Sequence, residues 1–296
     1  MDHRERFHRA AVERGIPEEE IAAFAGFLRF AIGTGPGYDG VIVGQMGGLP
    51  RLPVGMSWPV GDGTMPLPFI ASLDCAALPR VDDVPLPADG TLLFFLHHDR
   101  AFDEREEWDK DDEREYARVV YVPAGTPMVS AEKPDHPEEV FYNTRLSFVG
   151  AEQRLAAAVH AELPRWFEDD EPAAPAGDDD HLGLRLPHLA QLCDLARKLW
   201  PENRASLQLG GYTWGTGALA TRHMSHTPEV EMAERNLGPG RRGAELERET
   251  LRIMREWVTL AQFVPEDVYR ARFLIRRDDL AAGRFDRALS LTAFTA

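Results

Sequence analysis

Cysteine is almost absent from this chain of 296 residues, which contains only Cys75 and Cys193. Two cysteines in apolar segments cannot form the disulfide framework of a small secreted domain, and they are typical of buried free thiols in a reducing compartment. No apolar run is long enough to span a bilayer, and the N-terminal residues lack the features of a secretory signal. We therefore expect a cytoplasmic protein without a disulfide.

Positive charge is also scarce. Lysine and arginine number 33 against 49 aspartates and glutamates, which gives a formal net charge of -16 at pH 7. Such a charge repels the phosphate backbone of nucleic acids and the surface of anionic membranes. It favours a basic protein as partner. Hydrophobic residues still make up 44% of the chain, which is enough for a folded core.

Complete catalytic and metal-binding motifs are missing too. There is no Gly-x-Ser-x-Gly elbow, and both cysteines lie where burial raises the pKa of a thiol. His97, His98 and Asp99 follow a predicted strand. His223 and His226 are three residues apart in a polar stretch. Neither group has the further ligands of a zinc site, so we expect no metal, no cofactor and no catalytic residue identifiable from sequence.

Apolar residues recur at helical spacing in four segments. These predicted helices are 17–32, 152–167, 186–199 and 244–257. Residues 33–37 are rich in glycine but follow a predicted helix, whereas a phosphate-binding loop follows a strand. We therefore interpret 33–37 as a flexible connection.

Short apolar segments between glycines and prolines predict strands. They are 41–43, 68–73, 91–96, 118–122, 258–264, 272–275 and 288–294, with the charged residues 102–116 as a hairpin connection. Segments 68–74 and 257–263 are similar in shape, which suggests the hypothesis of a duplicated β unit. The alternative is that both are unrelated buried strands.

One long pattern resembles a known family. Residues 47–59 read Gly-Gly-Leu-Pro-Arg-Leu-Pro-Val-Gly-Met-Ser-Trp-Pro, and 66–74 read Pro-Leu-Pro-Phe-Ile-Ala-Ser-Leu-Asp. With 90–95, 209–212 and 257–262, they resemble the YwqG-like family of bacterial proteins of unknown function. The resemblance implies a mainly β fold with peripheral helices (α+β), built as a rolled or barrel-like sheet, and no activity. The chain departs from the family at Ser72, usually glutamine, at the position of Ser206, usually histidine, and at Thr213, usually proline.

The domain organisation that we expect has two parts. Residues 1–37 form an N-terminal helical segment packed on the core, and residues 38–296 form a single YwqG-like, β-rich domain. The acidic run 168–180 is predicted to be a mobile loop, because its Asp, Glu, Ala, Pro and Gly residues cannot bury apolar area.

Glycines and aromatic residues mark the candidate binding site. Glycines and prolines in 47–59 predict a rigid loop, which either caps the sheet or walls a ligand site. We expect segments 47–58 and 209–214 to lie close together and to form one ligand- or partner-binding surface. Its residues would be Gly47, Gly48, Trp58, Gln208, Tyr212, Trp214 and Gln262.

Two classes of function remain open. The first is a non-catalytic protein-binding module with a basic partner, such as a toxin-neutralising or immunity-type protein. The alternative is a small-ligand-binding protein or enzyme with a pocket near the Gly-Pro-Trp loop. A deep apolar pocket with convergent polar groups would favour the second class, and a broad acidic face the first.

Deleting residues 168–180 tests the loop assignment. Because Pro172 and Pro175 prevent a helix there, we expect the shortened protein to keep its thermal midpoint within about 2 °C. A protein that keeps its midpoint but loses capture of a partner would make the loop a binding element. A large drop in the midpoint would show that the loop is packed structure.

Overall fold

A computed structural model describes residues 2–61, 65–97, 116–135, 149–163, 186–201, 205–214, 227–238, 243–264 and 269–294. Its main sheet contains β1 (Arg29–Gly35), β2 (Ile42–Met46), β6 (Phe69–Asp74), β7 (Thr91–Leu96), β8 (Ala117–Val122), β10 (Gln153–Glu162), β11 (Leu207–Gly210), β12 (Trp257–Phe263), β13 (Tyr269–Arg276) and β14 (Leu289–Phe294). Two short ribbons pair β3 (Arg51–Pro53) with β9 (Met128–Ser130) and β4 (Val60–Gly61) with β5 (Met65–Pro66).

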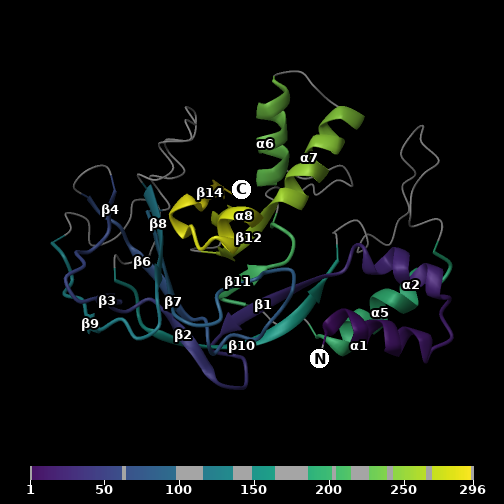
Figure 1. Ribbon diagram of the computed structural model, residues 1–296, viewed down its shortest axis with the longest axis horizontal. Coiled ribbons are helices and arrows are strands. Elements are labelled where there is room, and N and C mark those ends of the chain that lie inside the picture. Colours follow the sequence, from purple (N-terminus) through teal and green to yellow (C-terminus); the bar gives the residue numbers. More distant parts are fainter. Residues whose placement is uncertain are drawn as a thin grey trace.

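The ten strands form one antiparallel sheet in the order β14-β13-β12-β11-β1-β10-β2-β6-β7-β8 (Figure 1). The sheet is rolled until its two ends approach each other. Phe94 of β7 and Phe273 of β13 lie with ring centroids 5.5 Å apart, although six strands separate them in the sheet. Tyr121 of β8 lies 5.4 Å from Phe285 in the 3-10 turn η4 (Phe285–Arg287) that leads to β14. The predicted fold class, a mainly β, barrel-like sheet with peripheral helices, is confirmed.

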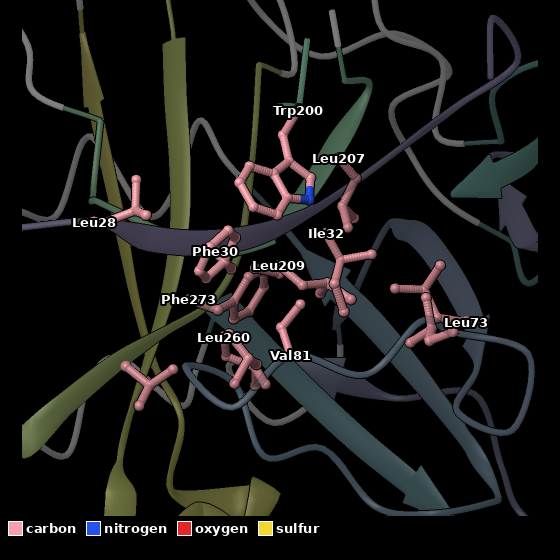
Figure 2. Packing of buried hydrophobic residues seen from close by; sticks show 14 of the residues in the cluster. Leu28, Phe30, Ile32, Leu73, Val81, Trp200, Leu207, Leu209, Leu260 and Phe273 are labelled. Atoms are coloured by element: carbon pink, nitrogen blue, oxygen red, sulfur yellow. The ribbon is translucent and has the colours of Figure 1, made fainter. Parts of the chain in front are cut away.

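Apolar side chains fill the inside of the roll. Figure 2 shows how residues from distant strands converge there: Phe30 and Ile32 of β1, Leu73 of β6, Leu207 and Leu209 of β11, Leu260 of β12 and Phe273 of β13. All of them are at most 2% exposed. Each such side chain contributes about 1.5–3 kcal/mol through burial, so this shared interior holds the two ends of the sheet together.

Helices cover two separate parts of the sheet (Figure 1). The described helices are α1 (His3–Val12), α2 (Glu18–Ala25), α5 (Leu189–Leu199), α6 (Pro228–Leu237), α7 (Ala244–Glu256) and α8 (Arg277–Ala281). α1, α2 and α5 pack together, with Phe7 stacked on Phe24 at 5.4 Å. α6 and α7 form a second pair. No helix in the described ranges is both long and apolar enough to cross a membrane.

The strand order reveals an internal duplication. Each strand of the first half has a counterpart in the second: β1 and β10, β2 and β11, β6 and β12, β7 and β13, β8 and β14. Replacing every strand by its counterpart gives the same order read from the other end of the sheet. Details of register agree. Gln45 pairs with Ser72 in one copy and Gln208 with Gln262 in the other. The register also shifts at equivalent places. In β6 it shifts at Ile70, two residues before Ser72, and in β12 it shifts between Thr259 and Ala261, two residues before Gln262.

The turns after β2 and β11 repeat as well. Gly47 and Gly48 have φ of 66° and 69°, and Gly210 and Gly211 have φ of 75° and 77°. In both copies the glutamine two residues earlier donates its amide to the carbonyl of the first glycine, at 3.0 and 3.1 Å. The similarity of 68–74 to 257–263 therefore reflects a duplicated unit, with Ser72 equivalent to Gln262, one residue away from the alignment expected from sequence.

The prediction of a helix over 152–167 is wrong, because Gln153–Glu162 forms the central strand β10. Its alanine content favours a helix locally, but hydrogen bonding to β1 on one side and β2 on the other overrides that propensity. The sequence does contain the two-residue alternation of a strand, because every second residue packs on the core: Leu155, Ala157, Val159 and Ala161.

The predicted helix 17–32 is also wrong in its second half. α2 ends at Ala25, and the chain continues as β1, so the glycines of 33–35 lie in a central strand and not in a flexible connection. Gly33 allows close packing there, because a Cβ would displace the Tyr38 hydroxyl and lie 3.0 Å from the His160 ring. The N-terminal segment 1–37 thus contributes helices to the core and a strand to the centre of the sheet.

The other elements agree with expectation. All seven predicted strands and the predicted helices 186–199 and 244–257 correspond to observed ones, whereas α1 and α6 were not anticipated. Cys75 and Cys193 are buried, and burial raises the pKa of the Cys75 thiol to about 11. The predicted hairpin connection 102–116, apart from its last residue, and the predicted loop 168–180 lie outside the described residues.

Gly44 tests the close pairing of β2 with β6. A Cβ at this position would overlap the backbone carbonyl oxygen of Ser72, which has no freedom to move aside. We expect Gly44→Ala to lower the free energy of unfolding in urea by about 1–3 kcal/mol. Gly150→Ala is the control, since its Cβ would meet no atom within 4 Å. Equal stability of the two variants would contradict this account.

Candidate functional site

The seven predicted site residues lie in two separate places, so the expectation that segments 47–58 and 209–214 form one site is wrong. β2 and β11 flank the central β1–β10 pair on opposite sides and run in opposite directions. Gly48 donates to the Gly150 carbonyl, just before β10 begins, whereas Gly211 lies against Glu162, where β10 ends. Ten residues of strand, about 30 Å, separate the two turns.

On the β11 side (β1, β11, β12, β13 and β14), a short segment crosses the outer face of the sheet. We call residues 211–214 the strap. The side-chain amide of Gln262 binds it like a peptide group: Nε2 donates to Tyr212 O and Oε1 accepts from Trp214 N, both at 2.9 Å. Arg272 donates from Nη1 to Trp214 O at 3.0 Å. Gln262 and Arg272 are at most 1% exposed, so they hold the strap on the sheet.

Gln208 joins the strap to the centre of the sheet. Its Oε1 lies 3.0 Å from His160 Nε2, and its Nε2 donates to Glu162 Oε1 at 2.8 Å. Glu162 Oε2 in turn accepts from Tyr212 N at 2.7 Å. These polar groups are engaged with one another in a nearly dry location, as buried polar groups must be.

Tyr212 has no freedom for acid–base chemistry. Its hydroxyl donates to Phe27 O at 2.7 Å, and the Arg29 guanidinium lies 4.2 Å from the centre of its ring. Burial raises the pKa of Tyr212 to about 12, so the phenol stays protonated at physiological pH. Gln208, Tyr212, Trp214 and Gln262 therefore act together in holding the strap.

Trp58 belongs to a second, smaller core on the β2 side (β10, β2, β6, β7 and β8). Its Nε1 donates to Leu67 O at 2.8 Å, and its ring meets Phe95 edge-on at 6.0 Å. The buried members of this core are Leu52, Leu67, Phe69, Leu93, Phe95 and Val122. Trp58 thus packs the two short ribbons against the outer face of the sheet.

Beside this small core lies an open groove of about 590 Å³. Its floor is the outer face of β2, β6 and β7, with Gln45, Ser72 and Leu93 side by side in register. Arg51 and Met128 of the β3–β9 ribbon form one wall. We call this space the groove.

Charges of both signs line the groove. Arg51 and Arg154 bring two guanidinium groups, and Asp74 and Glu152 bring two carboxylates. Histidine and cysteine are absent from its lining, and the described parts of the chain contain no group of three or more His, Cys, Asp or Glu that could hold a metal ion. The arrangement can bind polar and charged groups through complementary contacts.

A model of a domain of unknown function, DUF1963, matches residues 44–292. The chain belongs to this family. The DUF1963 match begins in β2 and ends in β14, so it contains the strap and the groove lining except Ile42 and Val43, while β1 at the centre of the sheet precedes it. No curated protein matches the chain.

The residues that line the groove in this DUF1963 protein were missed from sequence. None of the seven predicted residues lines it, although the turn at Gly47 and Gly48 lets the lining residue Gln45 reach the carbonyls of Gly47 and Leu49. One signal was available. Ser72, where the YwqG-like resemblance implies glutamine, lies on the groove floor.

Equivalent glutamines in the two copies provide a matched test. Gln208 is buried, and its loss removes one hydrogen-bond partner from His160 Nε2 and one from Glu162 Oε1. Gln45 is partly exposed. We expect Gln208→Met to lower the free energy of unfolding by about 2–4 kcal/mol and Gln45→Met by less than about 1 kcal/mol. Equal losses in urea titrations would contradict the assignment of Gln208 to a buried network.

Proposed function

We propose that this chain is a non-catalytic binding protein whose partner is another protein, docked at the groove. The observation that carries the proposal is where apolar side chains are exposed. Of the eight large apolar residues exposed in the described part of the chain, Ile42 lines the groove, and Val41, Leu49, Val54 and Val129 lie within three residues along the chain of one that does. Exposed apolar groups beside a polar cleft are typical of protein-binding surfaces.

The charge of the chain supports a basic partner. A net charge of -16 speeds encounter with a basic protein and slows encounter with an acidic one. Within the groove itself, Asp74 and Glu152 are balanced by Arg51 and Arg154, so the preference for a basic partner comes from the charge of the whole chain. Neutralisation of a basic toxin, as by an immunity-type protein, is the specific form of this proposal. We also propose that the chain is a member of the YwqG-like family, because segments 47–59 and 66–74 resemble that family.

The surroundings of Ser72 favour binding over catalysis. A serine nucleophile needs a neighbouring base to accept its proton. Ser72 lies between Gln45 and Leu93 on the adjacent strands, and neither side chain is a base. Asp74 and Glu152 are the bases in the groove lining, and the Ser72 hydroxyl donates to neither in the described structure.

The second candidate is a small polar molecule as ligand. A volume of about 590 Å³ lies within the range of small-molecule sites, and two arginines beside two acids would suit a zwitterion. The apolar residues around the groove favour the protein partner, because a small molecule inside the groove would leave them uncovered.

Blocking the groove tests both candidates. A photo-activatable cross-linker at position 126, in the groove lining, should capture one protein from a lysate of the source cells. Thr91→Trp, which fills the groove from β7, should reduce that capture at least tenfold. Leu251→Trp on the exposed face of α7 is the control and should leave capture unchanged.

Capture that survives Thr91→Trp in a folded variant would refute docking at the groove. A small molecule seen by native mass spectrometry on the wild type, absent from the Thr91→Trp variant and unaccompanied by a cross-linked protein, would establish the second candidate instead. Circular dichroism and the thermal midpoint confirm that each variant is folded.

A further inference from the structure

The groove occupies the place where the other copy of the duplicated unit binds its own strap. The cross-strand row on the β11 side is Gly33, Gln208, Gln262 and Arg272. The equivalent row on the β2 side is Arg154, Gln45, Ser72 and Leu93. The glutamine next to the glycine turn is kept, but the two residues that hold the strap are replaced by shorter ones.

The replacements remove the groups that close the β11 side. Serine is three heavy atoms shorter than glutamine and has no amide, so Ser72 cannot make the paired contacts that Gln262 makes with Tyr212 and Trp214. Leucine lacks the guanidinium with which Arg272 binds Trp214 O. The β2 side therefore keeps open the space that two side chains fill on the β11 side.

The backbone groups that would meet such a glutamine are still present. Counting from the first glycine of each turn, Tyr212 corresponds to Leu49 and Trp214 to Arg51. The equivalent groups are thus the Leu49 carbonyl and the Arg51 N–H. Leu49 O accepts from Gln45 Nε2 at 3.2 Å, and a carbonyl oxygen has a second lone pair for another donor.

The N–H of Arg51 points away from the β9 strand. Ala131 N donates to Pro50 O and Val54 N donates to Pro127 O, so residues 50, 52 and 54 direct their backbone groups toward β9. In an antiparallel pair the residues between them direct theirs to the other side. Among the described residues, no acceptor meets the Arg51 N–H, and Arg51 lines the groove.

We propose that the groove binds a carboxamide, carried by a glutamine or asparagine side chain of the protein partner, in the position that Gln262 takes in the other copy. Its oxygen accepts from the Arg51 N–H, and its NH₂ donates to Leu49 O. This inference rests on the proposed function, since it names the group that the partner inserts.

The geometry selects an amide over other polar groups. The site presents one donor and one acceptor side by side, and a carboxamide offers the complementary acceptor and donor in one plane. A carboxylate would place an oxygen against Leu49 O and lie among Asp74 and Glu152. An ammonium would place a donor against the Arg51 N–H. Both charged groups therefore lose one of the two hydrogen bonds.

Ser72→Gln restores the missing side chain and tests the equivalence within the chain itself. We expect its amide to occupy the groove, to raise the thermal midpoint by about 2 °C or more, and to lower capture of the partner at least tenfold. Ser72→Glu is the matched control, because it has the same shape but no NH₂ donor. It should not raise the midpoint.

Peptide binding to the wild-type protein gives a measurement that does not depend on folding of a variant. The probes are acetyl-Ala-Gln-Ala-dimethylamide and acetyl-Ala-Glu-Ala-dimethylamide, whose C-terminal group has no N–H, and the readout is the ¹H–¹⁵N signal of Arg51. We expect the glutamine peptide to shift this signal and to bind at least tenfold more tightly than the glutamate peptide. In the Ser72→Gln variant the shift should disappear.

Two outcomes would overturn the inference: an Arg51 signal that the glutamine peptide leaves unmoved, or equal affinity for the two peptides. Either result would leave the proposed function intact if Thr91→Trp still abolished capture of the partner. Conversely, a partner that cross-links equally well to the Thr91→Trp variant would refute the proposed function whatever the peptides do. The two failures are therefore distinguishable.

Discussion

The antiparallel pairing of β1 with β10 is the constraint on which the rest of the sheet depends. Seven residue pairs, from Arg29 with Glu162 to Gly35 with Ala156, join these strands at the middle of the ten-stranded order. Each half of the chain contributes one of the two strands, and each strand then pairs with the meander of the other half. Gly33 lets the His160 ring and the Tyr38 hydroxyl pack closely against this pair, because a Cβ there would displace the hydroxyl.

The same unit is used in two ways on the two sides of this central pair. On the β11 side, Gln262 and Arg272 are buried and bind the strap, and the buried Gln208 is linked to it through Glu162, so their polar groups are satisfied inside the protein. On the β2 side, Ser72 and Leu93 leave a groove with backbone groups at its wall. A buried polar network must be complete to stabilise a fold. The β11 copy meets this requirement, whereas the equivalent positions of the β2 copy line an open groove.

The sequence predicted the strands whose character is local and missed those that depend on distant partners. β6, β7, β12 and β14 are apolar segments between turns, and they were found. β1 and β10 contain many glycines and alanines, and only their pairing with each other makes them strands. Missing β1 and β10 also made the predicted site wrong. These two strands lie between β2 and β11 in the sheet, and without them the glycine turns after β2 and β11 were expected to lie close together. The groove could not be predicted from the sequence, because residues that line it, such as Ser72, Arg154 and Met128, lie far apart along the chain.

The proposed site on the β2 side has an energetic advantage. In the β11 copy, the glycine turn at Gly210 and Gly211 leads directly into the strap. The β2 copy keeps that turn, with Gln45 bonded to the carbonyls of Gly47 and Leu49. Its wall is therefore ordered before any ligand arrives, so binding costs little conformational entropy. The proposed carboxamide would therefore meet a wall that the scaffold already holds in place, in the space that Gln262 and Arg272 fill in the other copy.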